Sequence, residues 1–184
     1  MNFADHRNRT EWDWLFLMQH YGVPTRLLDW TQSPLVGLYF AVTDTDTNSG
    51  DSALWCVSPV ALNSMSGVEP EFELDLPSFD MDEVLDGYLP SRLAKERGSR
   101  LQSIAAIASR SSPRLFAQRG VFTISHRDLT PIEELRDEGH VWRYVVGAES
   151  KLKIFEELQL LKIDRLSLFP ELSNVAHVIM EEMP

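Results

Sequence analysis

The sequence predicts an α+β fold in which helices pack on a small mixed sheet. Some segments carry apolar residues at helical spacing, while others alternate apolar and polar residues as strands do. The two kinds of segment do not alternate strictly along the chain, which argues against a regular β-α-β architecture. The length of 184 residues fits one domain, which we predict to span residues 1–184.

The predicted helices lie near Trp14, Tyr39, Phe155 and Val178. The first should span about residues 9–20, with Thr10 as its cap and Gly22 ending it. The second should begin at Ser33, with Pro34 in the first helical position. A further helix is predicted over residues 101–109. Two apolar stripes are expected to face the core: Leu152, Phe155, Leu158 and Leu161 on one helix, and Leu172, Ala176, Val178 or Ile179, and Met180 on the last.

The predicted strands cover residues 25–29, 53–57, 120–125 and 141–146, and we expect them to share one sheet. A short acidic helical turn should begin at Pro131. Residues 66–90 form an acidic excursion without a basic residue, whereas residues 91–127 are strongly basic. The excursion either folds over the basic segment or is a solvated linker.

Composition excludes several classes of protein. The net charge of −11 argues against non-specific binding to nucleic acid or to an anionic membrane. Cys56 is the only cysteine, so the chain has no internal disulfide and a reducing cytoplasm fits. The longest apolar window, residues 30–43, is shorter than the roughly 20 residues of a membrane-spanning helix. We therefore expect a soluble cytoplasmic protein that requires no metal and no membrane.

The densest polar segment, QHYGVPTRLLDWT at residues 19–31, lies between two predicted helices, where a scaffold would position it. Arg26 could pair with Asp29 or grip a phosphate or carboxylate through its planar fork, and the two roles are compatible, because a paired aspartate can aim the arginine. Tyr21 and Trp30 fit core positions better than stacking platforms. The candidate ligand-binding residues of this segment are Gln19, His20, Tyr21, Thr25, Arg26, Asp29 and Thr31.

A second polar segment contains Arg114 and Gln118, which are four residues apart and would share one helical face. Gln118 could orient a ligand hydroxyl by accepting and donating hydrogen bonds, or it could simply cap a helix. No phosphate-binding loop, nucleophile elbow or dinucleotide-binding glycine motif occurs. We predict one cleft lined by Gln19, His20, Arg26, Thr31, Arg114 and Gln118.

Three blocks of the sequence together resemble the FRG domain family. They are LMQHYGVPTRLLDWTQSPLVGLYFAV, AQRGVFTISH and LFPELSNVAHVIM, and they occur in the family's order. The aromatic-Arg-Gly motif that names the family is absent from this sequence. The resemblance therefore implies an N-terminally truncated domain that lacks its first strand. Such a domain would leave an open sheet edge and would associate with itself or with a separate fragment.

The order of these blocks is similar to that of ADP-ribosyltransferases, and it implies an NAD-binding domain. Arg26 and Thr31 would contact the phosphates or ribose of NAD. Gln118 would stand near the late catalytic residue, where it would orient a ribose hydroxyl without supplying charge. The alternative is a non-catalytic ligand or protein-interaction module in a bacterial defence or stress system. Contact with nucleic acid is less favoured, because few exposed aromatic residues interleave with the basic ones.

Overall fold

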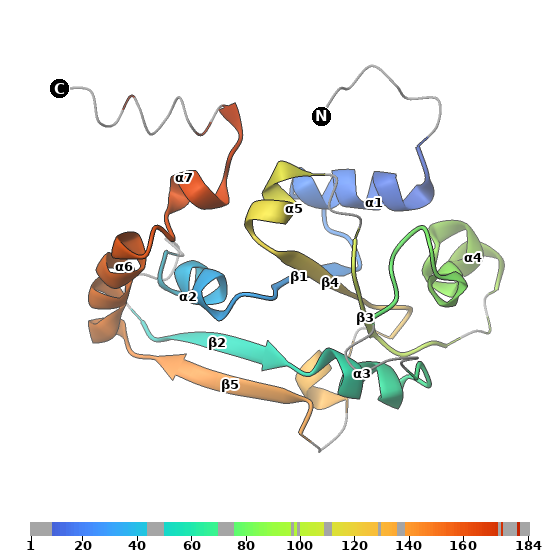
Figure 1. The fold of residues 1–184 in the computed structure, drawn as a ribbon. Helices are drawn as coiled ribbons and strands as arrows, with labels where there is room; N and C mark the ends of the chain where they lie inside the picture. Colours follow the sequence, from blue (N-terminus) through green and yellow to red (C-terminus); the bar gives the residue numbers. More distant parts are fainter. Residues whose placement is uncertain are drawn as a thin grey trace. The chain divides into compact units, whose positions relative to one another are not determined.

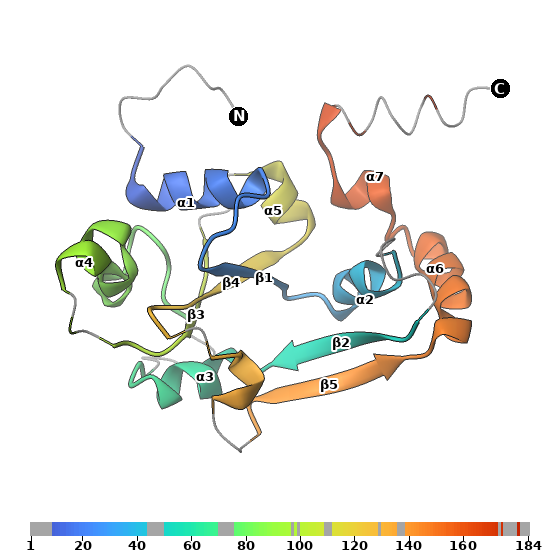
Figure 2. The same ribbon diagram turned by 180° about the vertical axis from the view of Figure 1, so that it is seen from behind.

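The computed structural model describes residues 9–43, 50–69, 76–96, 98, 100–108, 112–128, 130–135, 139–172, 174 and 180. The chain falls into two compact units, whose helices and strands are labelled in Figures 1 and 2. Unit 1 comprises Met1–Trp30, Val57–Ser109 and Val121–Val141. Unit 2 comprises Thr31–Cys56, Arg110–Gly120 and Trp142–Pro184. Helices are combined with two small antiparallel sheets, which confirms the α+β class.

Unit 1 is built on a three-stranded sheet with the order β1-β4-β3. The central strand β4 pairs antiparallel with β3, so that Ala105 lies opposite Thr123. The sheet strands are β1 (Leu27–Thr31), β3 (Ile104–Ala106) and β4 (Gly120–Ile124), of which β1 and β4 each extend one residue into unit 2. The helices are α1 (Glu11–His20), α3 (Pro59–Met65), η3 (Glu83–Tyr88), α4 (Pro90–Lys95) and η4 (Ile132–Glu134).

Helix α1 begins where the sequence predicts. The Thr10 hydroxyl accepts a hydrogen bond from the Asp13 amide at 3.1 Å, and the Asp13 carboxylate accepts one from the Thr10 amide at 2.9 Å. This reciprocal cap satisfies two amides that a helix start leaves without partners. Trp12 and Phe16 both pack edge to face against Phe79, and their ring centroids lie 4.8 and 5.2 Å, respectively, from that of Phe79. Local capping and aromatic packing therefore fix the same helix.

Residues 101–108 do not form the helix predicted over 101–109, because their centre is the strand β3. A short apolar run fits a buried strand as well as a buried helix turn, so spacing alone could not decide between them. All three residues of β3 are buried. The outer edge of β3 is satisfied by a side chain of α3: Asn63 Nδ2 donates to the Ala105 carbonyl at 2.9 Å, and Asn63 Oδ1 accepts from the Ala105 amide at 2.7 Å.

The described part of the acidic excursion is not a solvated linker. Phe79 and Leu85 are fully buried. The Phe79 amide donates to the Ile107 carbonyl at 2.9 Å, and the Ile107 amide donates to the Pro77 carbonyl at 2.8 Å. Buried apolar side chains and paired main-chain groups outweigh the solvation of the neighbouring carboxylates. Residues 76–89 thus fold onto the start of the basic segment.

Among its described residues, unit 2 combines the two-stranded sheet β2-β5 with five helical segments. Its core contains Val36, Tyr39, Val42, Val146, Leu158 and Leu168. Helix α2 packs closely against β2 at Gly37. A Cβ atom added at this glycine would lie only 2.9 Å from Leu54 Cδ1. The elements are α2 (Pro34–Thr43), β2 (Ser52–Val57), α5 (Pro113–Ala117), β5 (Val141–Val146), η5 (Ala148–Ser150), α6 (Lys151–Leu160) and α7 (Arg165–Leu168).

The structure corrects four further predictions. The predicted strands divide between two antiparallel sheets instead of forming one mixed sheet, and the first of them begins at Leu27 rather than at residue 25.

On α6 the core-facing residues are Ile154, Phe155 and Leu158, whereas Leu152 and Leu161 are exposed. Leu152 and Leu161 are nine residues apart. At about 100° per residue they point to opposite sides of a helix, so they cannot belong to one stripe. Leu172 and Met180 are also exposed, and Ala176, Val178 and Ile179 lie outside the described residues. Within the described ranges, no helix has the length and apolar character to cross a membrane.

Candidate functional site

The first group of candidate residues belongs to unit 1 and is organised by Gln19, in the last turn of α1. The Gln19 side-chain oxygen accepts from the Thr25 hydroxyl at 2.5 Å, and its amide nitrogen donates to an Asp29 carboxylate oxygen at 3.0 Å. The Thr25 hydroxyl oxygen also accepts from the Leu27 amide at 3.1 Å. These contacts fix the connection from α1 to β1. The structure therefore brings Gln19, Thr25 and Asp29 together, and their hydrogen bonds hold this connection in place.

The Arg26 guanidinium is directed at main-chain carbonyls. It donates to the carbonyl of Ser125 at 2.8 Å and to the carbonyl of Tyr88. Burial lowers the pKa of Arg26 below its ordinary value, and the charge of Arg127 lowers it further. No ion pair joins Arg26 to Asp29, both of which are described residues, and this corrects that interpretation. A ligand contact by Arg26 stays a prediction.

His20 and Tyr21 lie at the exposed end of α1, with their rings edge to face at a centroid distance of 5.2 Å. Tyr21 is 60% exposed, so its interpretation as a core residue is wrong. Trp30 does contribute to the core: it packs beside Leu62, Ala105 and Ile132, and its indole Nε1 donates to the Thr123 hydroxyl at 3.0 Å. The interpretation of Trp30 as core is therefore confirmed.

The second group belongs to unit 2 and contains Thr31, Arg114 and Gln118. The Thr31 hydroxyl donates to the Gln118 carbonyl at 2.7 Å and accepts from the Ser33 amide at 3.0 Å. Gln118 is the C-cap residue of α5, and its amide donates to the Arg114 carbonyl at 2.9 Å. The Gln118 side-chain nitrogen donates to the Leu168 carbonyl at 3.2 Å. Gln118 thus has the predicted capping role, while its orientation of a ligand hydroxyl stays a prediction.

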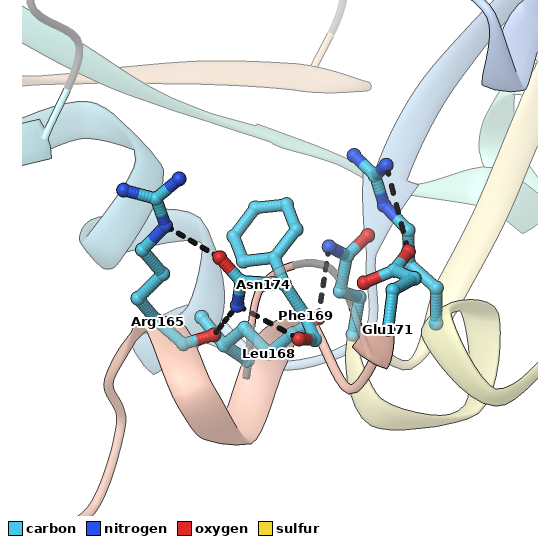
Figure 3. Close-up of polar contacts among 7 residues, drawn as sticks. Arg165, Leu168, Phe169, Glu171 and Asn174 are labelled. Carbon is cyan, nitrogen blue, oxygen red and sulfur yellow. Dashed lines mark hydrogen bonds and ion pairs between the residues drawn. The ribbon is translucent and has the colours of Figure 1, made fainter. Parts of the chain in front are cut away.

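Arg114 lies between an aromatic ring and a carboxylate. Its guanidinium carbon is 4.8 Å from the centroid of the Phe169 ring, and one of its nitrogens is 3.9 Å from Glu171 Oε1. Figure 3 shows Glu171 and Phe169 on the segment that follows Leu168. Both charged side chains remain about one third exposed. The ring and the carboxylate together orient the guanidinium, and part of it stays accessible to solvent.

Asn174 closes the segment that faces Arg114. Its side-chain oxygen accepts from Arg165 Nε at 2.7 Å, and its nitrogen donates to the carbonyls of Phe169 at 2.8 Å and Arg165 at 3.3 Å (Figure 3). Sequence reasoning missed Phe169, Glu171 and Asn174 as site residues. The signal was present, because all three lie in the third block, LFPELSNVAHVIM, which was interpreted only as a helix.

The candidate residues thus form two groups, one in each unit, and the single cleft that would join them stays a prediction. Within unit 2, Thr31, Gln118 and Arg114 are connected through the contacts above. Across the residues that the structure describes, no cluster of three or more histidine, cysteine, aspartate or glutamate side chains could hold a metal ion. Any ligand chemistry of the second group would therefore rest on its cation, hydroxyl, carboxamide and aromatic ring.

Residues 1–50 match the family model of the FRG domain. The match includes the first of the three blocks and all candidate residues from Gln19 to Thr31, but neither Arg114 nor Gln118. Comparison with curated proteins and comparison with solved structures each gave no match.

Proposed function

We propose, on the premise that the chain belongs to the FRG domain family, as the match over residues 1–50 supports, that it is an ADP-ribosyltransferase-like domain that binds NAD. Arg114 would contact the pyrophosphate of NAD, and Gln118 would orient a ribose hydroxyl. Thr31 would support Gln118 through the hydrogen bond to its carbonyl. This assignment moves the phosphate contact from Arg26 to Arg114.

The environment of Arg114 carries the proposal. Its guanidinium is held over the Phe169 ring and remains partly accessible to solvent. A guanidinium presents donors in a planar fork that matches two phosphate oxygens. Arg26, by contrast, already donates to two main-chain carbonyls, so a phosphate would have to displace them. Of the two arginines first considered, Arg114 is better placed for an external anion.

A non-catalytic binding module is the second candidate, and Gln118 favours it. A carboxamide carries no charge with which to stabilise the positive charge that develops when the bond between nicotinamide and ribose breaks. Its nitrogen is also directed at the Leu168 carbonyl. Measuring NAD consumption beside NAD binding separates the two candidates: binding with turnover supports a transferase, and binding without turnover supports a module.

Calorimetric titration of NAD into the wild type and Arg114→Ala tests the proposal. Losing a charge-assisted contact should weaken binding about tenfold. Arg143→Ala is the matched control, because Arg143 also lies over an aromatic ring in unit 2, with its guanidinium carbon 5.7 Å from the centroid of Trp55. The control should retain wild-type affinity. No heat with millimolar NAD, or equal affinities for Arg114→Ala and the wild type, would refute NAD binding at Arg114.

A further inference from the structure

We propose that residues 165–172 and Asn174, here called the strap, occupy the ligand position at Arg114 and compete with an anionic ligand for it. The inference rests on the proposed function, and it adds a means by which the site is kept closed. All the residues that carry it belong to unit 2 (Figure 3).

The strap places an anionic group where Arg114 would meet a phosphate. The Glu171 carboxylate, 3.9 Å from the Arg114 guanidinium, takes the place of the phosphate. The Phe169 ring lies beneath the guanidinium and packs against the core of unit 2, so it stays as part of the site. The Leu168 carbonyl, which accepts from the Gln118 carboxamide, also stays in place because Leu168 is buried. Glu171 therefore acts as an internal substitute for an anionic ligand.

One end of the strap is anchored, and the other is held by its own side chains. Leu168 is buried in the core beside Val36 and Leu158, so α7 remains fixed. Beyond it, Asn174 bonds to the Phe169 carbonyl and to two atoms of Arg165, which folds the chain back over α7. Residues 170–172 can leave Arg114 while Leu168 and Phe169 stay packed against the core, provided that this fold opens.

The contacts of the strap with Arg114 are weak enough for a ligand to replace them. The ion pair is long and partly exposed, and such pairs contribute little. Glu171 Oε1 is buried and accepts no hydrogen bond from any residue that the structure describes, which is a cost to the closed arrangement. Leu172 is 86% exposed and adds no apolar anchor. An incoming pyrophosphate would give Arg114 closer acceptors than Glu171 does.

The test compares Glu171→Gln with Glu157→Gln in the full chain, with inorganic pyrophosphate and NAD as separate probes in calorimetry. Glu157 is a matched control, because it also forms a 3.9 Å ion pair in unit 2, with Lys153, and its substitution removes the same charge. Glu171→Gln should bind the probes about two to five times more tightly than either the wild type or Glu157→Gln. In the wild type, saturating pyrophosphate should also speed hydrogen exchange in residues 170–172.

Each result decides between the two proposals. Tighter pyrophosphate binding by Glu171→Gln, without heat from NAD, would support the strap and refute the NAD function. Equal affinities of both variants for a bound probe, or unchanged exchange in residues 170–172, would refute the strap alone. Absence of binding by both probes to every form would refute both. Asn174→Ala, which should also speed exchange in residues 170–172, gives a second route if Glu171→Gln fails to fold.

Discussion

Arg26 shows that the neighbours of a charged residue, and not its type alone, decide what it does. The segment around it is polar enough to predict a ligand site, yet its guanidinium joins β1, η3 and the residue after β4 through the carbonyls of Tyr88 and Ser125. Those two carbonyls come from residues 62 and 99 positions away in the chain. No local pattern could have revealed them, whereas the Thr10 cap depends on residues three apart and was predicted correctly.

Replacing Arg26 with alanine should therefore destabilise the protein. Loss of charge-assisted hydrogen bonds to two part-buried carbonyls should reduce the free energy of unfolding by about 1.5–3 kcal/mol. The affinity for NAD, measured below the unfolding temperature, should stay at the wild-type value. Urea denaturation measures the free energy of unfolding, and calorimetric titration of the folded variant measures the affinity for NAD. A stable variant with weakened NAD binding would show that Arg26 contacts the ligand.

His126 should make stability fall in mild acid. Burial lowers the pKa of His126 below its ordinary value, and the charges of Arg127 and Arg26 lower it further. The hydrogen bond from the Leu101 amide to Nδ1, at 3.3 Å, also requires a ring without a proton on that nitrogen. Below about pH 6.5 the unfolded chain therefore binds a proton that the folded chain resists, and stability decreases as pH falls.

The measurement is the free energy of unfolding in urea at pH 7.5 and at pH 5.5. The wild type should lose more stability between these values than His126→Gln, which cannot titrate at this position. Equal losses in the two proteins would mean that His126 is protonated as readily in the folded chain as in the unfolded one.

At the scale of elements, strands bounded by clear turn residues were predicted better than those defined by the sheet around them. The strand β5 has the predicted bounds, residues 141–146, and β4 differs by one residue. The strand β3 was missed, because its three residues are strand only through their pairing with β4 and with Asn63. The stripe on α6 was half right, since Leu158 and Phe155 face the core.

Asn63→Ala tests how much the outer edge of β3 depends on one side chain. The substitution leaves both the amide and the carbonyl of Ala105 buried without the partners they have now. Each such group costs about 1–3 kcal/mol, so the free energy of unfolding should fall by about 2–6 kcal/mol. Urea denaturation measures the change. A loss below about 0.5 kcal/mol would show that other groups or water replace the asparagine.

At the scale of the whole molecule, the sequence identified part of the candidate site but not what covers it. Spacing on a helical turn was sufficient to single out Arg114 and Gln118. The packing of α7 and the residues after it against α5 brings Phe169, Glu171 and Asn174 to the site. No periodic pattern in the local sequence predicts that packing. The predicted join with Gln19, His20 and Arg26 stays a prediction.

The predicted association of chains has a candidate surface on β5. Its residues 142–145 are all exposed, and among them Trp142, Tyr144 and Val145 are large and apolar. Antiparallel pairing of this strand with its copy would be symmetric and would join the main-chain groups of the two strands. We expect a dimer by light scattering at tens of micromolar and a monomer for Val145→Lys. A monomeric wild type would contradict self-association.

Hydrogen exchange of the wild-type protein with and without saturating NAD tests the central claim most directly, because it locates the ligand on the chain. The account predicts slower exchange in α5 and Gln118 and faster exchange in residues 170–172. It predicts no change in residues 19–27, where Gln19 and Arg26 already have their partners. Protection confined to residues 19–27, with α5 unchanged, would contradict the assignment of the site to Arg114 and Gln118.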